Sequence, residues 1–190
     1  MPPEPSPLDV PPGPLAELLA RLRALWREQR RTVAQRWKRS LPFGDYVVDR
    51  WEKARELGFG DGASIYDSAL VLGDVKVGRE TWIGPGVVLD GSGGLTIGDH
   101  CSISAGVQIY THDSVAWALS GGKVAPTHAS TRIASRCYLG PHTVVAKGVE
   151  IGEGCVIGAH SLVLENIPAG SKAYGVPCRV VGTAVPGELT

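Results

Sequence analysis

Residues 131–163 read TRIASRCYLGPHTVVAKGVEIGEGCVIGAHSLV, and within this stretch an aliphatic residue returns at every sixth position. The same spacing holds from residue 65 to residue 109, with one two-residue insertion between residues 89 and 97. The aliphatic positions are Ile65, Val71, Val77, Ile83, Leu89, Ile97, Ile103, Ile109, Ile133, Leu139, Val145, Ile151, Ile157 and Val163. A fixed short period of this kind indicates a solenoid whose repeats stack on one another.

The six-residue unit has a simple physical interpretation. Six residues make one short strand and one corner, and three such units make a triangular coil that stacks on the next at about 4.8 Å. Small residues precede many of the aliphatic ones by two positions, and Cys101, Cys137 and Cys155 occupy such inward positions. Cys137 and Cys155 are one full coil apart, so we expect them to stack inside the coil as small buried hydrophobic residues.

Composition excludes several classes of protein. Glycine (25) and proline (14) together make 39 of the 190 residues, yet 43% of the chain is hydrophobic, which is too much for a disordered protein. No apolar run is long enough to cross a membrane, and the N-terminus does not resemble a secretory signal, so we expect a cytoplasmic protein. Nineteen basic residues balance nineteen acidic ones, which gives no argument for a nucleic-acid partner.

The N-terminal region differs from the rest. Residues 1–13 are predicted to form a disordered Pro-rich tail, and residues 14–60 a basic helical segment. Within it, residues 14–40 predict an amphipathic helix in which eight basic residues face two acidic ones, a net charge of +6. A second short helix is predicted at 46–57. The simpler interpretation is that the basic helix packs on the domain or on a sister subunit, and contact with a membrane surface is the alternative.

Four of the five histidines occupy equivalent places in the repeat. His100, His112, His142 and His160 each follow an aliphatic position by three residues, a corner where a left-handed backbone is tolerated. This structural role accounts for His100, His142 and His160. His112 differs in context, because residues 114–130 leave the solenoid directly after it, and loops on a rigid scaffold are where function concentrates. His112 is therefore the candidate functional histidine.

The repeat resembles that of the hexapeptide-repeat family, whose fold is a left-handed parallel β-helix. Within that family, residues 131–164 and the ending Gly175-Val176-Pro177-Cys178-Arg179-Val180 are similar to the acetyltransferases that modify sugars. These include galactoside and maltose acetyltransferases and the O-acetyltransferases of surface polysaccharide biosynthesis. The resemblance implies a β-helix domain at 61–168, a C-terminal tail at 169–190 that contributes to the CoA site, and acetyl-CoA-dependent transfer to a hydroxyl of a sugar or polysaccharide precursor.

The resemblance also implies a set of site residues. His112 matches the family's catalytic base, a role that suits imidazole at neutral pH. Asp90 is the nearest match to an acidic contact with the acceptor, and Asp113 and Trp117 are further candidates for acceptor contacts. The positions expected to contact CoA are Pro141, Ala146, Ala159, Leu164 and Arg179. At Leu164 and Glu165 the chain departs from the Thr-Lys pair that is frequent in the family.

The same resemblance implies a homotrimer that binds CoA between neighbouring solenoids, with the 114–130 loop of one chain beside the site of another, and no metal requirement. Three other interpretations stay open at this point. In the first, the protein is an acetyltransferase that acts on an amine of an amino sugar or amino acid. In the second it is a zinc protein resembling the hexapeptide-repeat carbonic anhydrases, and in the third it is a solenoid that only binds a partner. The histidines lack the close pair that the zinc site of those anhydrases uses.

Overall fold

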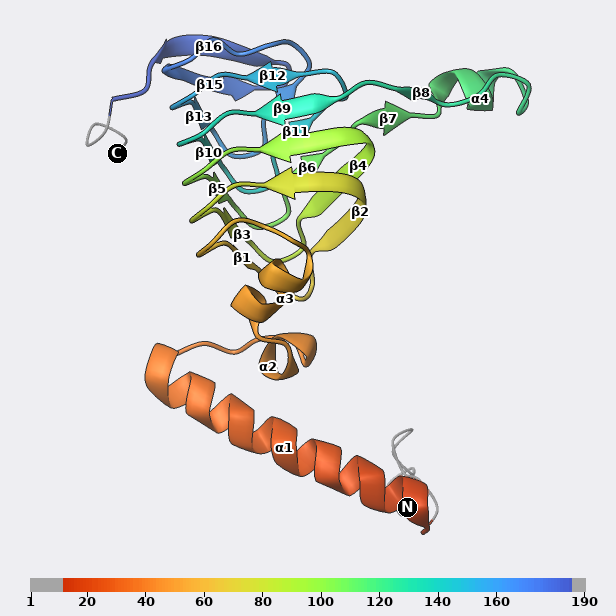
Figure 1. Cartoon of the computed structure of the whole chain (residues 1–190), viewed down its shortest axis with the longest axis vertical. Helices are drawn as coiled ribbons and strands as arrows, with labels where there is room; N and C mark the ends of the chain where they lie inside the picture. The colour runs from red at the N-terminus through yellow and green to blue at the C-terminus, as the bar shows by residue number, and fades with distance from the viewer. Residues whose placement is uncertain (1–11, 186–190) are drawn as a thin grey trace, which may run out of the picture. The chain divides into compact units, whose positions relative to one another are not determined.

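The computed structural model describes residues 12–185, which divide into one unit up to Val47 and a second from Val48 (Figure 1). The predicted tail at 1–13 lies almost entirely outside the described residues. In the first unit, α1 spans Pro14–Trp37 and α2 spans Gly44–Val47. Lys38 ends α1 in the left-handed conformation, and its backbone N–H donates to the carbonyl of Ala34. None of the helices in residues 12–185 combines the length and the apolarity needed to cross a bilayer.

The single helix predicted at 46–57 is wrong, because the chain forms two helices there. The second, α3, spans Arg50–Glu56 and belongs to the second unit. Asp49 interrupts the helical path: its backbone is extended, and its carboxylate accepts hydrogen bonds from the backbone N–H groups of Trp51 and Glu52. An aspartate N-cap of this kind starts a new helix and does not continue the old one. The predicted end is correct, since Gly58 has a φ of 72°.

The second unit is a parallel β-solenoid built from stacked corners and short strands (Figure 1). One of its sheets contains, in spatial order, β1 (Ser64–Ile65), β3 (Trp82–Ile83), β5 (Ser102–Ile103), β10 (Tyr138–Leu139), β13 (Val156–Ile157), β15 (Ser171–Gly175) and β16 (Cys178–Thr183). The other long sheet contains β12 (Glu150–Ile151), β9 (Thr131–Ile133), β4 (Val88–Ile97), β6 (Gln108–Ile109), β11 (Val144–Val145) and β14 (Leu162–Val163), with β2 (Leu70–Val77) on β4.

The strand β4 passes around a corner and so joins two faces of the solenoid. Its beginning pairs with β6, at Leu89 opposite Ile109, and its end pairs with β9, at Ile97 opposite Ile133. The residues between these two pairs, 90–94, contain the two-residue insertion that the sequence revealed. A mainly β solenoid is thus confirmed, and the insertion is located at one corner of it.

The predicted interior of the solenoid is confirmed. Thirteen of the fourteen aliphatic positions are buried, and the exception, Val71, is half-buried on β2, which pairs only with β4 among the described strands. The three inward cysteines are also buried, and their thiols donate to backbone carbonyls, as in the 3.1 Å contact from Cys137 Sγ to Gly152 O. Burial raises the pKa of the Cys155 thiol. The burial of all three side chains agrees with their expected role as packing residues.

The corner histidines also behave as predicted. His100, His142 and His160 have φ values of 55°, 58° and 55°, and the rings of His142 and His160 stack with centroids 5.1 Å apart. The left-handed backbone explains why a histidine, and not a β-branched residue, is found at these positions.

The C-terminal segment adds strands to the solenoid. In β15, Ala173 pairs in parallel with Ile157, and β16 then turns back to pair antiparallel with β15. Cys178 is buried at the start of β16. Residues 171–183 therefore form part of a sheet, although the sequence suggested a tail.

Candidate active site

The candidate site begins at the inserted corner of β4. Asp90 lies in this corner and its side chain is 0% exposed. Its Oδ1 accepts hydrogen bonds from the backbone N–H of Ser92 (3.0 Å) and the Ser92 hydroxyl (2.5 Å), and its Oδ2 accepts one from the backbone N–H of Thr111 (2.8 Å). The Thr111 hydroxyl also lies 3.2 Å from Oδ2, so Ser92 and Thr111 each make two contacts with this carboxylate.

These hydrogen bonds decide the charge of Asp90. Burial is the largest single influence and favours the neutral acid, but the hydrogen bonds from Ser92, Thr111 and His112 together outweigh it. The pKa of Asp90 is therefore held well below its ordinary range, and the group is a carboxylate at neutral pH. A buried anion needs a partner that can donate a hydrogen bond.

His112 is that partner. Its Nδ1 lies 2.6 Å from Asp90 Oδ2, across 22 residues of sequence. Because an ionised carboxylate only accepts hydrogen bonds, Nδ1 carries the proton, and in the neutral ring Nε2 is left as the acceptor. The His112 side chain is 36% exposed. The hydrogen bond therefore fixes the Nδ1 edge of the imidazole against the protein, while part of the ring is open to solvent.

The backbone distinguishes His112 from the other corner histidines, which the repeat register alone did not. His112 belongs to strand β7 (His112–Asp113) and is absent from the described residues with positive φ. Strand β7 pairs antiparallel with β8 (Thr127–His128), which places the rings of His112 and His128 together, with centroids 5.8 Å apart. Here the chain leaves the solenoid and returns as a two-stranded ladder.

The ladder carries the loop predicted from the break in the repeat. Figure 1 shows β7, β8 and the short helix α4 (Val115–Leu119) projecting away from the stacked coils. Trp117 lies on α4 and is 50% exposed. The structure therefore separates Trp117, a candidate acceptor contact, from the coils that hold His112.

Asp113, the other candidate in this loop, has a structural partner. Its carboxylate lies 2.7 Å from Lys147 Nζ, and the same ammonium group contacts the Thr127 hydroxyl across the ladder. The hydrogen bond from Lys147 is the main reason that the pKa of Asp113 is lowered. Asp113 thus anchors the base of the loop to the next coil of the solenoid.

The expectation that Asp90 contacts the acceptor does not agree with this geometry. Its side chain is fully buried, and both carboxylate oxygens are engaged by protein groups. Sequence reasoning also missed Ser92, Thr111 and Lys147, which hold Asp90 and the loop base. The signal available in the sequence was the insertion after Leu89, because an insertion in so regular a repeat indicates a corner whose backbone path differs from that of the others.

The positions expected to contact CoA form two groups on neighbouring corners. Ala146 follows β11 and Leu164 follows β14, and these strands pair in register, with Tyr110 on the adjoining coil. This row therefore runs along the solenoid from the coil of His112. Pro141 and Ala159 lie at the preceding corner, where the N–H of His160 donates to the carbonyl of Pro141.

Arg179 is not part of these two corners but lies on β16. Its Nη1 is 3.8 Å from the Glu165 carboxylate and donates to the carbonyl of Cys178 at 2.9 Å. Glu165 directly follows Leu164, so this ion pair brings the arginine to the C-terminal end of the row that begins beside His112.

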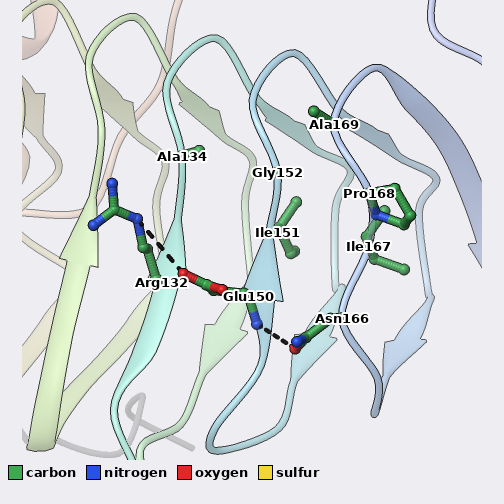
Figure 2. A pocket seen from close by; sticks show the side chains of 9 residues that line it. All are labelled: Arg132, Ala134, Glu150, Ile151, Gly152, Asn166, Ile167, Pro168 and Ala169. Carbon is green, nitrogen blue, oxygen red and sulfur yellow. Dashed lines mark hydrogen bonds and ion pairs between the residues drawn. The ribbon is translucent and has the colours of Figure 1, made fainter.

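A separate pocket of about 340 Å³ opens on another face of the solenoid (Figure 2). Its polar groups are Arg132 and Glu150, which form a 3.8 Å ion pair, and Asn166, whose Oδ1 accepts a hydrogen bond from the backbone of Glu150. Segments of β9, β12 and residues 166–169 form its walls. None of the predicted site residues lines it. Over residues 12–185, no three His, Cys, Asp or Glu side chains are arranged to hold a metal ion.

Comparisons with known proteins agree with the repeat. Residues 130–165 match a family described as bacterial transferase hexapeptide (six repeats), and residues 74–111 match the hexapeptide repeat of succinyl-transferase. No curated protein sequence matches the chain significantly.

Two solved structures extend the comparison. The N-acyltransferase AntD from Bacillus cereus, in complex with dTDP and 3-hydroxybutyryl-CoA, is 25% identical, with a TM-score of 0.61 over 67% of this chain and 72% of its own. A hexapeptide-repeat acetyltransferase from Vibrio cholerae O1 biovar eltor, VCA0836, complexed with acetyl coenzyme A, is also 25% identical, with a TM-score of 0.58 over 92% of each chain. With its six-residue register and parallel coils, the chain is a hexapeptide-repeat β-solenoid that is similar to CoA-dependent acyltransferases.

Proposed function

We propose that the protein transfers an acetyl group from acetyl-CoA to a hydroxyl of a sugar or polysaccharide precursor, with His112 as the general base. The observation that carries this proposal is the 2.6 Å contact between His112 Nδ1 and the buried Asp90 carboxylate at the base of the projecting loop. A histidine fixed in this tautomer presents Nε2 as a proton acceptor, which is what attack by a hydroxyl on a thioester requires.

In the proposed reaction, His112 transfers the proton and Asp90 positions His112. Acetyl-CoA supplies an acetyl group already activated as a thioester. Nε2 of His112 accepts the proton of the acceptor hydroxyl as its oxygen attacks the carbonyl carbon, and the proton is then available to the departing thiolate. Asp90 is a positioning residue, because it touches His112 and keeps the proton on Nδ1. General-base assistance of this kind is worth about 10²–10⁴-fold in rate.

For CoA we propose the row formed by Ala146 and Leu164, with Pro141 and Ala159 on the neighbouring corner and Arg179 at the far end. The row starts on the coil next to His112, so a ligand lying along it would bring its thioester end toward the imidazole. Arg179 is more than half exposed, and a guanidinium suits phosphate oxygens better than any other side chain does.

Arg179→Gln tests this assignment. We expect the KM for acetyl-CoA to rise about tenfold, because one charge-assisted hydrogen bond is lost, while kcat stays within about twofold. Steady-state kinetics with varied acetyl-CoA measure both constants. Arg79→Gln is the matched control, since Arg79 is an exposed arginine paired with Asp99 on the solenoid, away from the row. Equal effects of the two variants would contradict the assignment.

We further propose a homotrimer in which each site lies between two chains. The support is the projecting loop: α4 and Trp117 extend away from the chain's own coils, so a neighbouring solenoid is the surface that they fit. Trp117 then contacts the acceptor bound at a neighbour's His112. Since acetyl-CoA is a cytoplasmic metabolite, the proposed reaction belongs in the cytoplasm.

The acceptor class is tested by a panel of matched pairs. The likeness to AntD, an N-acyltransferase, favours an amine acceptor as the second candidate. We expect release of free CoA with hydroxyl sugars and their nucleotide forms, and none above background with the amino-sugar counterparts. Turnover confined to the amines would replace the O-acetyltransferase proposal with N-acyl transfer, and the same His112 base would serve it.

A further inference from the structure

The helix α1 presents an apolar stripe that stays at least partly exposed among the described residues. Leucine recurs at helical spacing, and α1 contains no buried residue. The exposed fractions of Leu15, Leu18, Leu22 and Leu25 range from 40% to 72%. Such a stripe on a helix of 24 residues is large for a purely solvated surface, and it marks an interaction face.

The charges of α1 are arranged around this stripe. Arg23 and Arg30 follow Leu19 and Trp26 of the stripe by four residues, so they lie along one edge. The Arg30 guanidinium carbon lies 5.3 Å from the centroid of the Trp26 ring, which places the charge directly beside the stripe.

The opposite edge carries charges of both signs. Arg21 lies three residues after Leu18, and Arg36 lies three residues after Val33 and stacks on Trp37 at 4.7 Å. The acidic residues lie on the same side of the helix as Arg21, since Glu28 follows Leu25 by three residues, and Glu28 pairs with Arg31 at 3.0 Å. The stripe is therefore bordered by arginine along one edge and by both charge signs along the other, while residues 14–40 carry a net charge of +6.

This distribution decides between two occupants. If a second copy of α1 packed on the stripe, two segments that each carry a net charge of +6 would lie side by side, and their repulsion would oppose the contact. A surface of anionic lipid headgroups complements this net positive charge and accepts the apolar side chains of the stripe. Arginine side chains also extend readily from an apolar boundary toward charged headgroups.

We propose that α1 binds the surface of an anionic lipid bilayer, lying in the interface with its leucine and tryptophan stripe inserted between the headgroups. The helix then recruits the enzyme to the membrane surface. This proposal is independent of the acceptor chemistry at His112.

The test is sedimentation of the full-length protein with vesicles. We expect binding to vesicles of 30% phosphatidylglycerol in phosphatidylcholine at about 0.1 M salt, no binding to pure phosphatidylcholine, and release at about 1 M salt, where charges are screened beyond roughly 3 Å.

Two adjacent arginines give a matched pair of variants. Arg30→Gln removes a charge from the edge of the stripe, and Arg31→Gln removes the same charge from the back. A basic side chain near an anionic surface contributes about 1 kcal/mol, so Arg30→Gln should weaken vesicle binding roughly fivefold, and Arg31→Gln less than twofold. Leu22→Asn should weaken it by at least tenfold through the loss of the inserted side chain. Circular dichroism checks that each variant keeps the helix.

Three results would overturn the proposal. One is the absence of sedimentation with the anionic vesicles. A second is an equal loss with Arg30→Gln and Arg31→Gln, which would indicate attraction by net charge alone. The third is a wild-type oligomer in sedimentation velocity that Leu22→Asn dissociates while the vesicles stay free of protein, which would make a second copy of the chain the occupant.

Discussion

His112→Ala should lower the kcat of acetyl transfer by about 10²–10⁴-fold, the range that general-base assistance contributes. The melting temperature should fall only modestly, because the buried Asp90 carboxylate loses one hydrogen bond but keeps those from Ser92 and Thr111. Release of free CoA, followed by a thiol reagent, measures the rate. The KM for acetyl-CoA should stay close to that of the wild type, since the proposed CoA row does not include His112.

A second histidine provides the control. His100→Asn alters a histidine in a left-handed corner away from the proposed CoA positions, where asparagine is also tolerated, and should leave kcat within about twofold. If His112→Ala keeps full activity, His112 is not the base. If His100→Asn loses as much as His112→Ala, the effect reports damage to the solenoid and not the loss of a proton acceptor.

Asp90→Asn should lower kcat by up to about 10⁴-fold without a comparable change in the KM for acetyl-CoA. The new amide donates a hydrogen bond where the carboxylate accepted one, so it favours a proton on Nε2 of His112 and removes the acceptor that the reaction needs. It also opposes the N–H of Thr111, which now points at Oδ2. One unsatisfied buried donor costs about 1–3 kcal/mol of stability, so assays belong well below the melting temperature.

The pH dependence of stability separates the two effects of this variant. The folded pKa of Asp90 lies below its ordinary value of 3.8, so its carboxylate stabilises the fold above about pH 4. That contribution falls as the pH drops through the folded pKa. The difference in unfolding free energy between wild type and Asp90→Asn should therefore shrink on acidification below pH 4. A normal kcat of the Asp90→Asn variant at neutral pH would contradict the proposal that Asp90 positions His112.

The sequence predicted the solenoid well because each coil repeats one local rule. Thirteen of the fourteen aliphatic positions are buried as expected. Val71 is the exception and is half-buried on β2, whose other aliphatic position, Val77, is buried. The helix at 46–57 was wrong because the apolar pattern continues across Asp49, whereas the cap at Asp49 breaks it.

Only part of the candidate site could be predicted from the sequence. The break in the repeat singled out His112 as a candidate, since the interruption is visible in the sequence. The role of Asp90 was not visible, because its contact to His112 spans 22 residues and depends on how the inserted corner folds under Thr111. Such a contact depends on the register between coils and on the path of the irregular corner. The six-residue period determines the register, but it does not determine the path of the corner.

The narrow base of the loop has a consequence for how such an enzyme can change. The ladder of β7 and β8 and the Lys147–Asp113 ion pair join residues 115–126 to the solenoid. Asp90, Ser92 and Thr111, which hold the imidazole, all lie outside those residues. Residues 115–126 can therefore change in sequence while the contacts between His112 and Asp90 stay the same, so under the proposed mechanism new acceptors become accessible without a change in the proton-transfer pair.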